Sequence, residues 1–225
     1  MLKKTLLAAA VFACATTAVQ ANEVSGYLTG SVGQAKAEKP KVVKEEQGLF
    51  KEFGGSTSSD RTDTAYKIAV GLKVNPYIAL EAQYIDLGKA SYKGSISEPG
   101  FGSYSEKIDF KTSGLGANLV GTLPLDDFTV FAKVGYHLLK TKGTLKDSVS
   151  ITGLGNFSDS ESKTVRKWTP SFGIGASYAI TQELAVVAEY ERYQDVANKK
   201  VNVYGDKTSF KHDIDLASVG LRYNF

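Results

Sequence analysis

The sequence predicts an all-β protein, an eight-stranded antiparallel up-and-down transmembrane β-barrel. Apolar residues recur at every second position in eight stretches, which is the period at which strand side chains alternate between two faces. The connections between these stretches alternate between long and short. Aromatic residues lie at both ends of the stretches, as they do in barrels that cross a bilayer with two interfaces.

The chain begins with a segment that we expect to be removed after export. Two lysines precede the apolar run Leu6–Ala15, and small residues end at Ala21, which gives the three parts of a secretory signal peptide. The apolar run is too short for a membrane-spanning helix, which needs about 20 residues. We therefore predict a signal peptide over residues 1–21 and a single barrel domain over residues 22–225.

The composition narrows the class of protein further. The 22 glycines and 12 tyrosines, set against only 5 prolines, favour strands and turns over disorder. The formal net charge is +3, and two lysines of the signal peptide contribute to it, so the mature chain offers no basic surface for nucleic acid. After residue 21 no run is long and apolar enough for a membrane helix, so a chain of this kind crosses lipid only as a closed barrel.

Four strands are expected in the first part of the chain. They cover Val24–Ala35, Ala65–Val74, Tyr77–Leu87 and a stretch that ends at Leu123. The second is the clearest, because its apolar and its small or charged residues alternate without a break. In the fourth, the region around Ile108 and Phe110 is out of register with the apolar face that follows, which predicts a bulge or a rim segment.

Four more strands are expected after it. They cover Phe128–Leu138, Trp168–Tyr178, Leu184–Glu191 and Ala217–Phe225. In the last of them every second residue is apolar, and the sequence stops on an aromatic residue. A closing strand that faces lipid on one side and polar groups on the other is typical of a membrane barrel.

The lengths of the connections indicate on which side of the membrane the two chain ends lie. Long polar segments cover residues 36–63, 88–106, 141–163 and 194–211, and short turns cover 75–76, 124–127 and 181–183. Short periplasmic turns and long extracellular loops are the plan of outer-membrane barrels, with both ends on the side of the short turns. A soluble sandwich or lipocalin-type barrel is the alternative, but the face opposite the apolar one carries Gly, Ala and Ser with isolated charges, as a narrow lumen would.

Several stretches carry a family resemblance. Asn75–Tyr84, Leu87–Ser95, Ser177–Thr181 and Val219–Phe225 closely resemble the transmembrane domain of the OmpA family. The resemblance implies an eight-stranded barrel in the outer membrane of a bacterium, and we expect it to be monomeric. Full-length members continue into a soluble peptidoglycan-binding domain, and the chain departs from them there, so we expect no cell-wall tethering. It also implies that the barrel-assembly machinery recognises the outward residues of the last strand, namely Val219, Leu221, Tyr223 and Phe225.

The inner face of the predicted barrel carries charges, which should form a polar network across the lumen. Its expected members are Lys67, Lys73, Glu81, Asn118, Lys133, Glu189, Glu191 and Arg222. Isolated buried charges are costly, so we expect them to pair, with Arg222 facing one of the three glutamates. By resemblance, Glu81 and Glu189 match carboxylates of the family's interior salt-bridge network and Lys133 matches an arginine. Asn118 stands where the family has a lysine.

We expect an envelope-structural or surface-interaction role through the long loops, with the polar network as a static plug. A narrow, low-conductance channel opened by exchange of ion-pair partners is the alternative. A lipid-modifying enzyme is a third hypothesis, but only His137 and His212 are available, and neither stands in a His-x-Ser pattern. We expect His137 in the lumen or rim and His212 in a loop, and we expect no enzyme activity, cofactor or metal. The expected partners are outer-membrane lipid, lipopolysaccharide, the assembly machinery and a surface ligand.

Overall fold

The computed structural model describes residues 25–198, 200–203 and 206–225. The predicted signal peptide lies outside these residues. The elements in chain order are β1 (Gly26–Ala37), α2 (Lys41–Glu52), β2 (Ser56–Asp60), β3 (Thr62–Asn75), β4 (Ile78–Glu98), β5 (Gly102–Leu125), β6 (Phe128–Ile151), β7 (Gly155–Ala179), β8 (Leu184–Val196), β9 (Lys200–Val203), β10 (Asp206–Ser209) and β11 (His212–Asn224).

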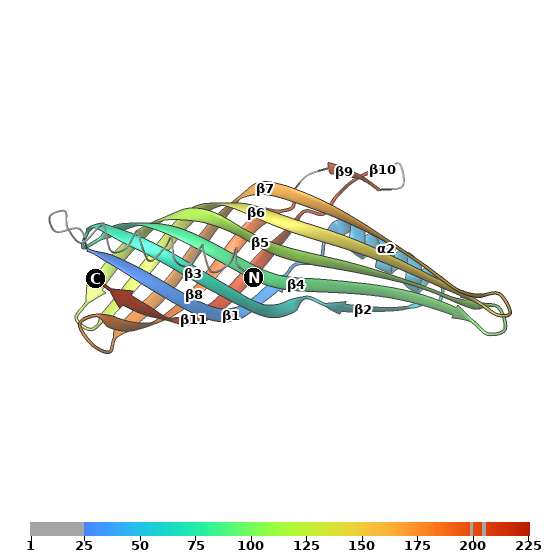
Figure 1. Cartoon of the computed structure of the whole chain (residues 1–225), viewed down its shortest axis with the longest axis horizontal. Helices are drawn as coiled ribbons and strands as arrows, with labels where there is room; N and C mark the ends of the chain where they lie inside the picture. Colours follow the sequence, from blue (N-terminus) through green and yellow to red (C-terminus); the bar gives the residue numbers. More distant parts are fainter. Residues whose placement is uncertain (1–24, 199, 204–205) are drawn as a thin grey trace, which may run out of the picture.

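Eight of these strands close into a ring, which confirms the predicted fold class. Each pairs antiparallel with its neighbours in the order β1, β3, β4, β5, β6, β7, β8 and β11, and β11 returns to pair with β1 (Figure 1). At the end of the seam, the backbone groups of Gly26 and Phe225 exchange two hydrogen bonds of 2.8 and 3.0 Å. Closure leaves no free backbone donor or acceptor along this seam to face lipid.

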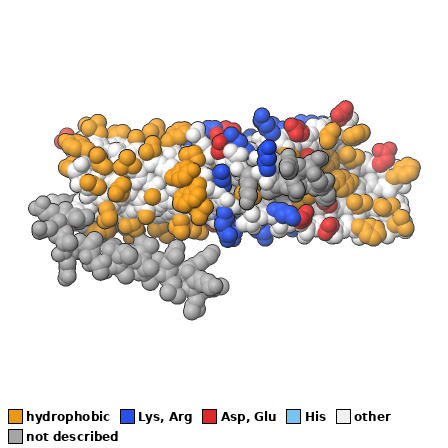
Figure 2. Space-filling model, turned by 90° about the horizontal axis from the view of Figure 1, so that it is seen from above, with side chains coloured by type: hydrophobic (Ala, Val, Ile, Leu, Met, Phe, Trp, Pro, Cys, Tyr) orange, Lys and Arg blue, Asp and Glu red, His pale blue; other side chains and the backbone are white. Residues whose placement is uncertain are grey.

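Many apolar side chains lie on the outer surface of one half of the barrel (Figure 2). Its aliphatic and aromatic side chains point outward and are exposed, including Ile68, Leu72, Leu80, Leu115, Leu119, Val130, Val134, Phe172, Ile174, Val186, Val219 and Leu221. Tyr77, Phe128, Tyr178 and Tyr223 border this band at the short turns, and Tyr66, Tyr84, Tyr136, Trp168 and Tyr190 border it at the opposite side. Two aromatic girdles around an aliphatic band match a bilayer with its two interfaces.

Four strands continue far beyond the membrane band. β5 and β6 have 24 residues each and β7 has 25, whereas about 9–11 residues suffice for a tilted strand to cross a bilayer. The segments 88–106 and 141–163, which the sequence analysis predicts to be loops, are instead the upper halves of two long hairpins, β4–β5 and β6–β7 (Figure 1). We call the part of β4–β7 above the aromatic girdle the extension.

The extension has an inverted pattern of polarity. In the membrane band the inner face is polar and the outer face apolar, but in the extension the apolar residues point inward. The inward residues form a buried cluster that includes Ala90, Tyr92, Ile108, Phe110, Leu139 and Val165. Of the two structures predicted around Ile108 and Phe110, the rim segment is present, because both residues lie in the upper part of β5, which stays regular. The register shift lies in β4, between Asp86 and Lys89.

The first long segment holds a helix instead of a plain polar loop. Helix α2 packs inside the curve of the extension and buries Val43, Gln47 and Phe50, a spacing that places all three on one helix face. The Phe50 ring stacks on Tyr104 with centroids 5.9 Å apart. Gln47 Nε2 donates to the backbone oxygens of Ser58 and Lys93. The sequence analysis missed this helix because its apolar residues are few and lie between charged ones.

Both edges of the extension differ from the closed ring. On one edge, β2 pairs with residues Ser91–Ser95 of β4. On the other, β8 pairs with β7 only from Ser171 onward, so among the described residues β7 has no neighbour beyond β6 above Pro170. The last predicted loop contains the β9–β10 hairpin. No helix in the described part of the chain is long and apolar enough to cross a membrane.

The narrow lumen makes one glycine a test of the packing. A Cβ atom on Gly71 would lie 2.0 Å from Tyr27 Cζ, whereas a Cβ on the lipid-facing Gly30 would meet no atom within 4 Å. We expect Gly71→Ala to lower the free energy of unfolding by about 1–3 kcal/mol through overpacking, and Gly30→Ala to change it by less than about 0.5 kcal/mol. Urea unfolding in lipid vesicles, followed by Trp168 fluorescence, measures both. Equal effects of the two substitutions would contradict the packed lumen.

Candidate functional site

A polar network fills the lumen within the membrane band, and each of the eight ring strands contributes to it. Its members are Tyr27 and Thr29 from β1, Lys67 from β3, Glu81 and Gln83 from β4, Asn118 from β5, Lys133 and His137 from β6, Ser171 from β7, Glu189, Glu191 and Tyr193 from β8, and Arg222 from β11. All are buried. The inward positions of the alternating pattern place them there, because small neighbours such as Gly135 and Gly173 leave room for their side chains.

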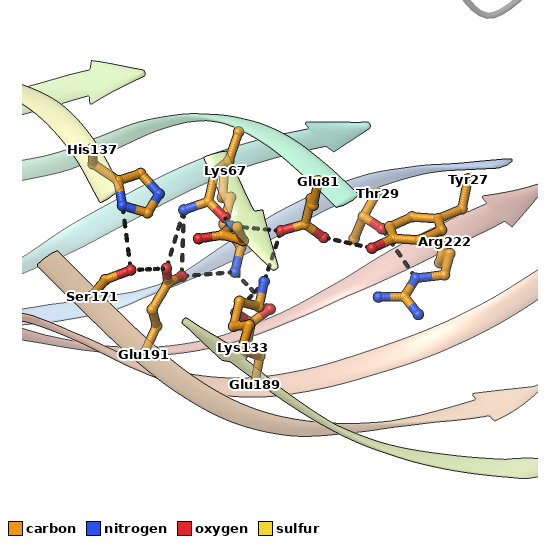
Figure 3. A network of polar contacts seen from close by, with 12 residues as sticks. Tyr27, Thr29, Lys67, Glu81, Lys133, His137, Ser171, Glu189, Glu191 and Arg222 are labelled. Carbon is orange, nitrogen blue, oxygen red and sulfur yellow. Dashed lines mark hydrogen bonds and ion pairs between the residues drawn. The ribbon is translucent and has the colours of Figure 1, made fainter. Parts of the chain in front are cut away.

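Two lysines and two glutamates form the centre of the network (Figure 3). Lys133 Nζ lies 2.9 Å from Glu81 Oε1 and 2.6 Å from Glu189 Oε1. The other Glu189 oxygen lies 2.7 Å from Lys67 Nζ. Glu189 therefore bridges the two lysines, and the four side chains, no more than 3 % exposed, satisfy one another across the lumen.

Toward the short turns the network ends on an aromatic and a guanidinium group. Tyr27 Oη donates to Glu81 Oε2 at 3.0 Å, and the Arg222 guanidinium lies over the Tyr27 ring at 4.2 Å from its centroid. Arg222 Nε also donates to Thr29 Oγ1. The expectation that Arg222 faces a glutamate is wrong: the ring of Tyr27 comes between Arg222 and Glu81, and the cation is stabilised by the π-face instead.

Toward the extension the network continues through Glu191. Lys67 Nζ lies 3.4 Å from Glu191 Oε2, and Ser171 Oγ donates to Glu191 Oε1 at 3.3 Å. Gln83 Nε2 donates to Glu191 and, at 2.7 Å, to the Tyr193 hydroxyl. Among the described residues, Lys67 is the only cation within salt-bridge distance of the Glu191 carboxylate. The neutral side chains of Ser171 and Gln83 donate further hydrogen bonds to it.

Two further predicted members are neutral or lie at the edge of the network. Asn118 Nδ2 donates to Glu81 Oε1 at 2.9 Å and to Gln83 Oε1 at 3.0 Å, so an amide supplies hydrogen bonds where the resembling family has a lysine. Lys73 is only half-buried and donates to Asn224 Oδ1 at 3.2 Å, near the short turns. The prediction that Lys73 pairs within the network is wrong, because among the described residues it contacts Asn224 and forms no ion pair with a network carboxylate.

Sequence reasoning missed several members. Tyr27, Thr29, Ser171 and Tyr193 were not selected, although each lies at an inward position of its strand. Gln83 also points inward. The prediction rests on charged residues, and the neutral groups that complete their hydrogen bonds carry no charge that would mark them. Inward parity within the predicted strands includes Tyr27, Thr29, Gln83 and Ser171, whereas Tyr193 lies beyond the predicted end of its strand at Glu191.

His137 and Ser171 do not form a catalytic pair with access to substrate. His137 Nδ1 lies 3.2 Å from Ser171 Oγ, but Ser171 stands between the histidine and Glu191, whereas in a hydrolase triad the histidine stands between the nucleophile and the acid. His137 and Glu191 are 0 % exposed. This arrangement holds the three side chains in place and gives no opening for a lipid chain.

His212 lies at the start of β11 and is buried, so its prediction as a loop residue is wrong. Its ring lies 6.0 Å from that of Phe110, within the apolar cluster of the extension. The residues predicted as an assembly signal also have defined positions. Val219, Leu221 and Tyr223 point outward from β11, and Phe225 closes the seam against Gly26. Their recognition by assembly machinery stays a prediction.

The chain is similar to known outer-membrane proteins. The profile of the outer membrane protein beta-barrel domain family matches residues 5–225. Outer membrane protein A of Escherichia fergusonii is 28% identical over 155 residues, which cover 69% of this chain and 38% of that protein. The corresponding protein of Klebsiella pneumoniae is 28% identical over 178 residues, covering 78% and 44%. The chain thus matches less than half the length of these relatives.

Two further matches extend over most of both chains. An uncharacterized protein of Coxiella burnetii is 27% identical over 232 residues, covering 91% of this chain and 88% of that one. The crystal structure of Neisserial surface protein A aligns with 89% of this chain and 97% of its own, with a TM-score of 0.51 and 15% sequence identity. At that identity the structural likeness shows the fold alone.

Removal of one carboxylate tests whether the network is a plug or a gate. In Glu81→Gln, Lys133 keeps Glu189 as its only close carboxylate, so we expect the free energy of unfolding to fall by about 1–3 kcal/mol. We also expect more frequent channel openings in planar bilayers. Glu52→Gln, an exposed change of the same kind on α2, is the control. Identical current traces for the unmodified protein and Glu81→Gln would reject the gate in which ion-pair partners exchange.

Proposed function

Because the chain belongs to the outer membrane protein beta-barrel domain family and lies in the bacterial outer membrane, we propose that it is a closed barrel that presents the extension as an interaction surface outside the cell. In this proposal the barrel anchors the protein in the membrane, and the extension carries the surface that contacts a ligand. A role of this kind requires a rigid projection and no open lumen.

The observation that carries this proposal is the build of the extension. Loops at this side of a membrane barrel are ordinarily irregular, but here continuous strands reach the turns at residues 98–102 and 151–155. The upper hairpins have their own buried core, with Phe110 and Tyr92 rings in edge contact at 6.0 Å. A projecting sheet with its own core keeps its outer face in a fixed shape, and preorganisation of this kind favours binding.

The lumen supports the same proposal over the channel alternative. The network joins side chains from all eight ring strands, and its central ion pairs are almost completely buried. An ion that crossed the barrel would have to separate Lys133 from two carboxylates in a medium where unpaired charges are costly. We therefore propose the static plug as the resting state.

Helix α2 strengthens the extension from inside and brings carboxyl groups together. Glu46 on α2 lies beside Glu106 of β5 and Asp147 of β6, and the Tyr104 hydroxyl donates to Glu106 at 3.3 Å and to Asp147 at 3.2 Å. Burial, followed by the charges of Glu106 and Asp147, raises the pKa of Glu46 to about 7. The helix is thus docked with a carboxyl group that binds a proton near neutral pH.

This geometry predicts that α2 docks more firmly in acid. A carboxyl group whose pKa is raised on docking binds its proton more tightly in the docked state, so the docking it favours is fully present below the ordinary carboxyl pKa and is lost as the pH rises through about 7. We expect hydrogen-exchange protection of residues 41–52, corrected for intrinsic rates, to fall roughly tenfold from pH 5 to pH 8. Glu46→Gln should remove this dependence, and Glu52→Gln should retain it.

Two experiments test the proposed function. First, a membrane-impermeant maleimide should label Ser158→Cys on intact cells but label Asp127→Cys, in a short turn, only after permeabilisation.

Second, replacement of residues 143–163 by a short turn should preserve the heat-dependent gel mobility of a folded barrel. The shortened protein should lose the attachment that the full chain confers on cells applied to a panel of protein- and glycan-coated plates. Equal attachment with the full, shortened and absent protein would refute the interaction role.

A further inference from the structure

Cations gather on the outer face of the barrel, directly above the membrane band (Figure 2). Register shows two adjacent rows. In the first, Lys140 of β6 lies opposite Arg166 of β7, and in the second, Lys89, Lys111 and Lys142 lie side by side on β4, β5 and β6. All five side chains are exposed. We call these five residues the boundary patch.

Neighbouring residues on the same strands show where the boundary patch lies relative to the membrane. The pair Leu138 and Trp168 lies on the same face two residues below Lys140 and Arg166, and Trp168 stacks on Tyr136 with centroids 5.4 Å apart. Tryptophan and tyrosine mark the interface between hydrocarbon and headgroups. Because two residues along a strand span roughly 7 Å, the patch lies at the level of the lipid headgroups.

Four of the five cations of the boundary patch form no ion pair among the described residues. Lys111 lies 3.7 Å from Asp86, but within the described residues Lys89, Lys140, Lys142 and Arg166 form no ion pair. Like charges directly opposite each other on neighbouring strands destabilise a sheet. Farther from the membrane band Lys107 is paired with Asp109, and Arg192, on the far side of the ring, is paired with Glu38, Asp213 and Asp215. The four unpaired cations of the boundary patch therefore lie together on β4, β6 and β7, beside Lys111 on β5.

We propose that the boundary patch binds the phosphorylated sugar headgroup of an outer-leaflet glycolipid, lipopolysaccharide. Phosphate groups at headgroup level would lie between the two rows and neutralise the lysines and the arginine together. Arg166 offers paired donors that suit phosphate oxygens, and the lysines act as point charges around it. The acyl chains of the same lipid would cover Leu138 and the stacked rings of Tyr136 and Trp168. This lipid site is independent of any ligand of the extension.

The test uses the full chain folded in neutral detergent and three lipid probes: diphosphoryl lipid A, enzymatically dephosphorylated lipid A, and phosphatidylglycerol. The patch variant is Lys140→Gln with Arg166→Gln. The control is Lys93→Gln with Lys146→Gln, which removes the same charge from the same outer face two rows farther from the membrane. Heat-dependent gel mobility verifies that every variant is folded.

We expect the unmodified protein to bind diphosphoryl lipid A more tightly than either other probe. The patch variant should bind it about 10- to 30-fold more weakly, since each cation near an anionic surface contributes appreciably, and the control should be unchanged. Diphosphoryl lipid A should raise the unfolding temperature of the unmodified protein and the control but not of the patch variant. Equal binding of the three lipids, or equal loss in both variants, would overturn the proposal.

Discussion

The structure depends on one constraint, which is that every backbone N–H and C=O group within lipid must be paired inside the protein. The seam between β1 and β11 meets that constraint for the first and last strands, and the short turns meet it for the rest. Closure with only eight strands then fixes the lumen width, so that side chains fill it and glycines such as Gly71 and Gly135 are required where larger side chains cross. The buried ion pairs follow from this narrowness.

A second consequence is the inversion of polarity along the long strands. Below the aromatic girdle, lipid lies outside and polar groups lie inside; above it, water lies outside and an apolar core lies inside. Along β5, Asn118 and Phe110 point to the same interior, yet one belongs to the polar network and the other to the apolar cluster of the extension. The strand is continuous, and only its surroundings change.

This inversion explains which parts of the fold the alternation of residues predicts and which parts it does not. The ring, its membrane band and the charged interior followed from alternation, because period and outer polarity agree within the bilayer. The extension did not follow, since Ile108, Phe110, Leu139 and Val165 fall on the opposite face from the lipid-facing residues and read as a break in the pattern. The sequence pattern does not predict helix α2, because only three residues on one face of the helix are buried. The partners of Arg222 and Lys73 are neutral side chains, Thr29 and Tyr27 for the first and Asn224 for the second, and a pairing of opposite charges does not predict them.

The unpaired stretch of β7 above Pro170 has a consequence in a crowded membrane. A free strand edge is a template on which another chain can add a strand, and neighbouring barrels would present such edges to one another. Here the stretch carries Glu161, Lys163, Arg166 and Lys167, all exposed, and its last unpaired residue is a proline that has no N–H to donate. Charge on the edge and a missing donor at its base oppose edge-to-edge association, so the projecting sheets can stand close together without joining into fibres.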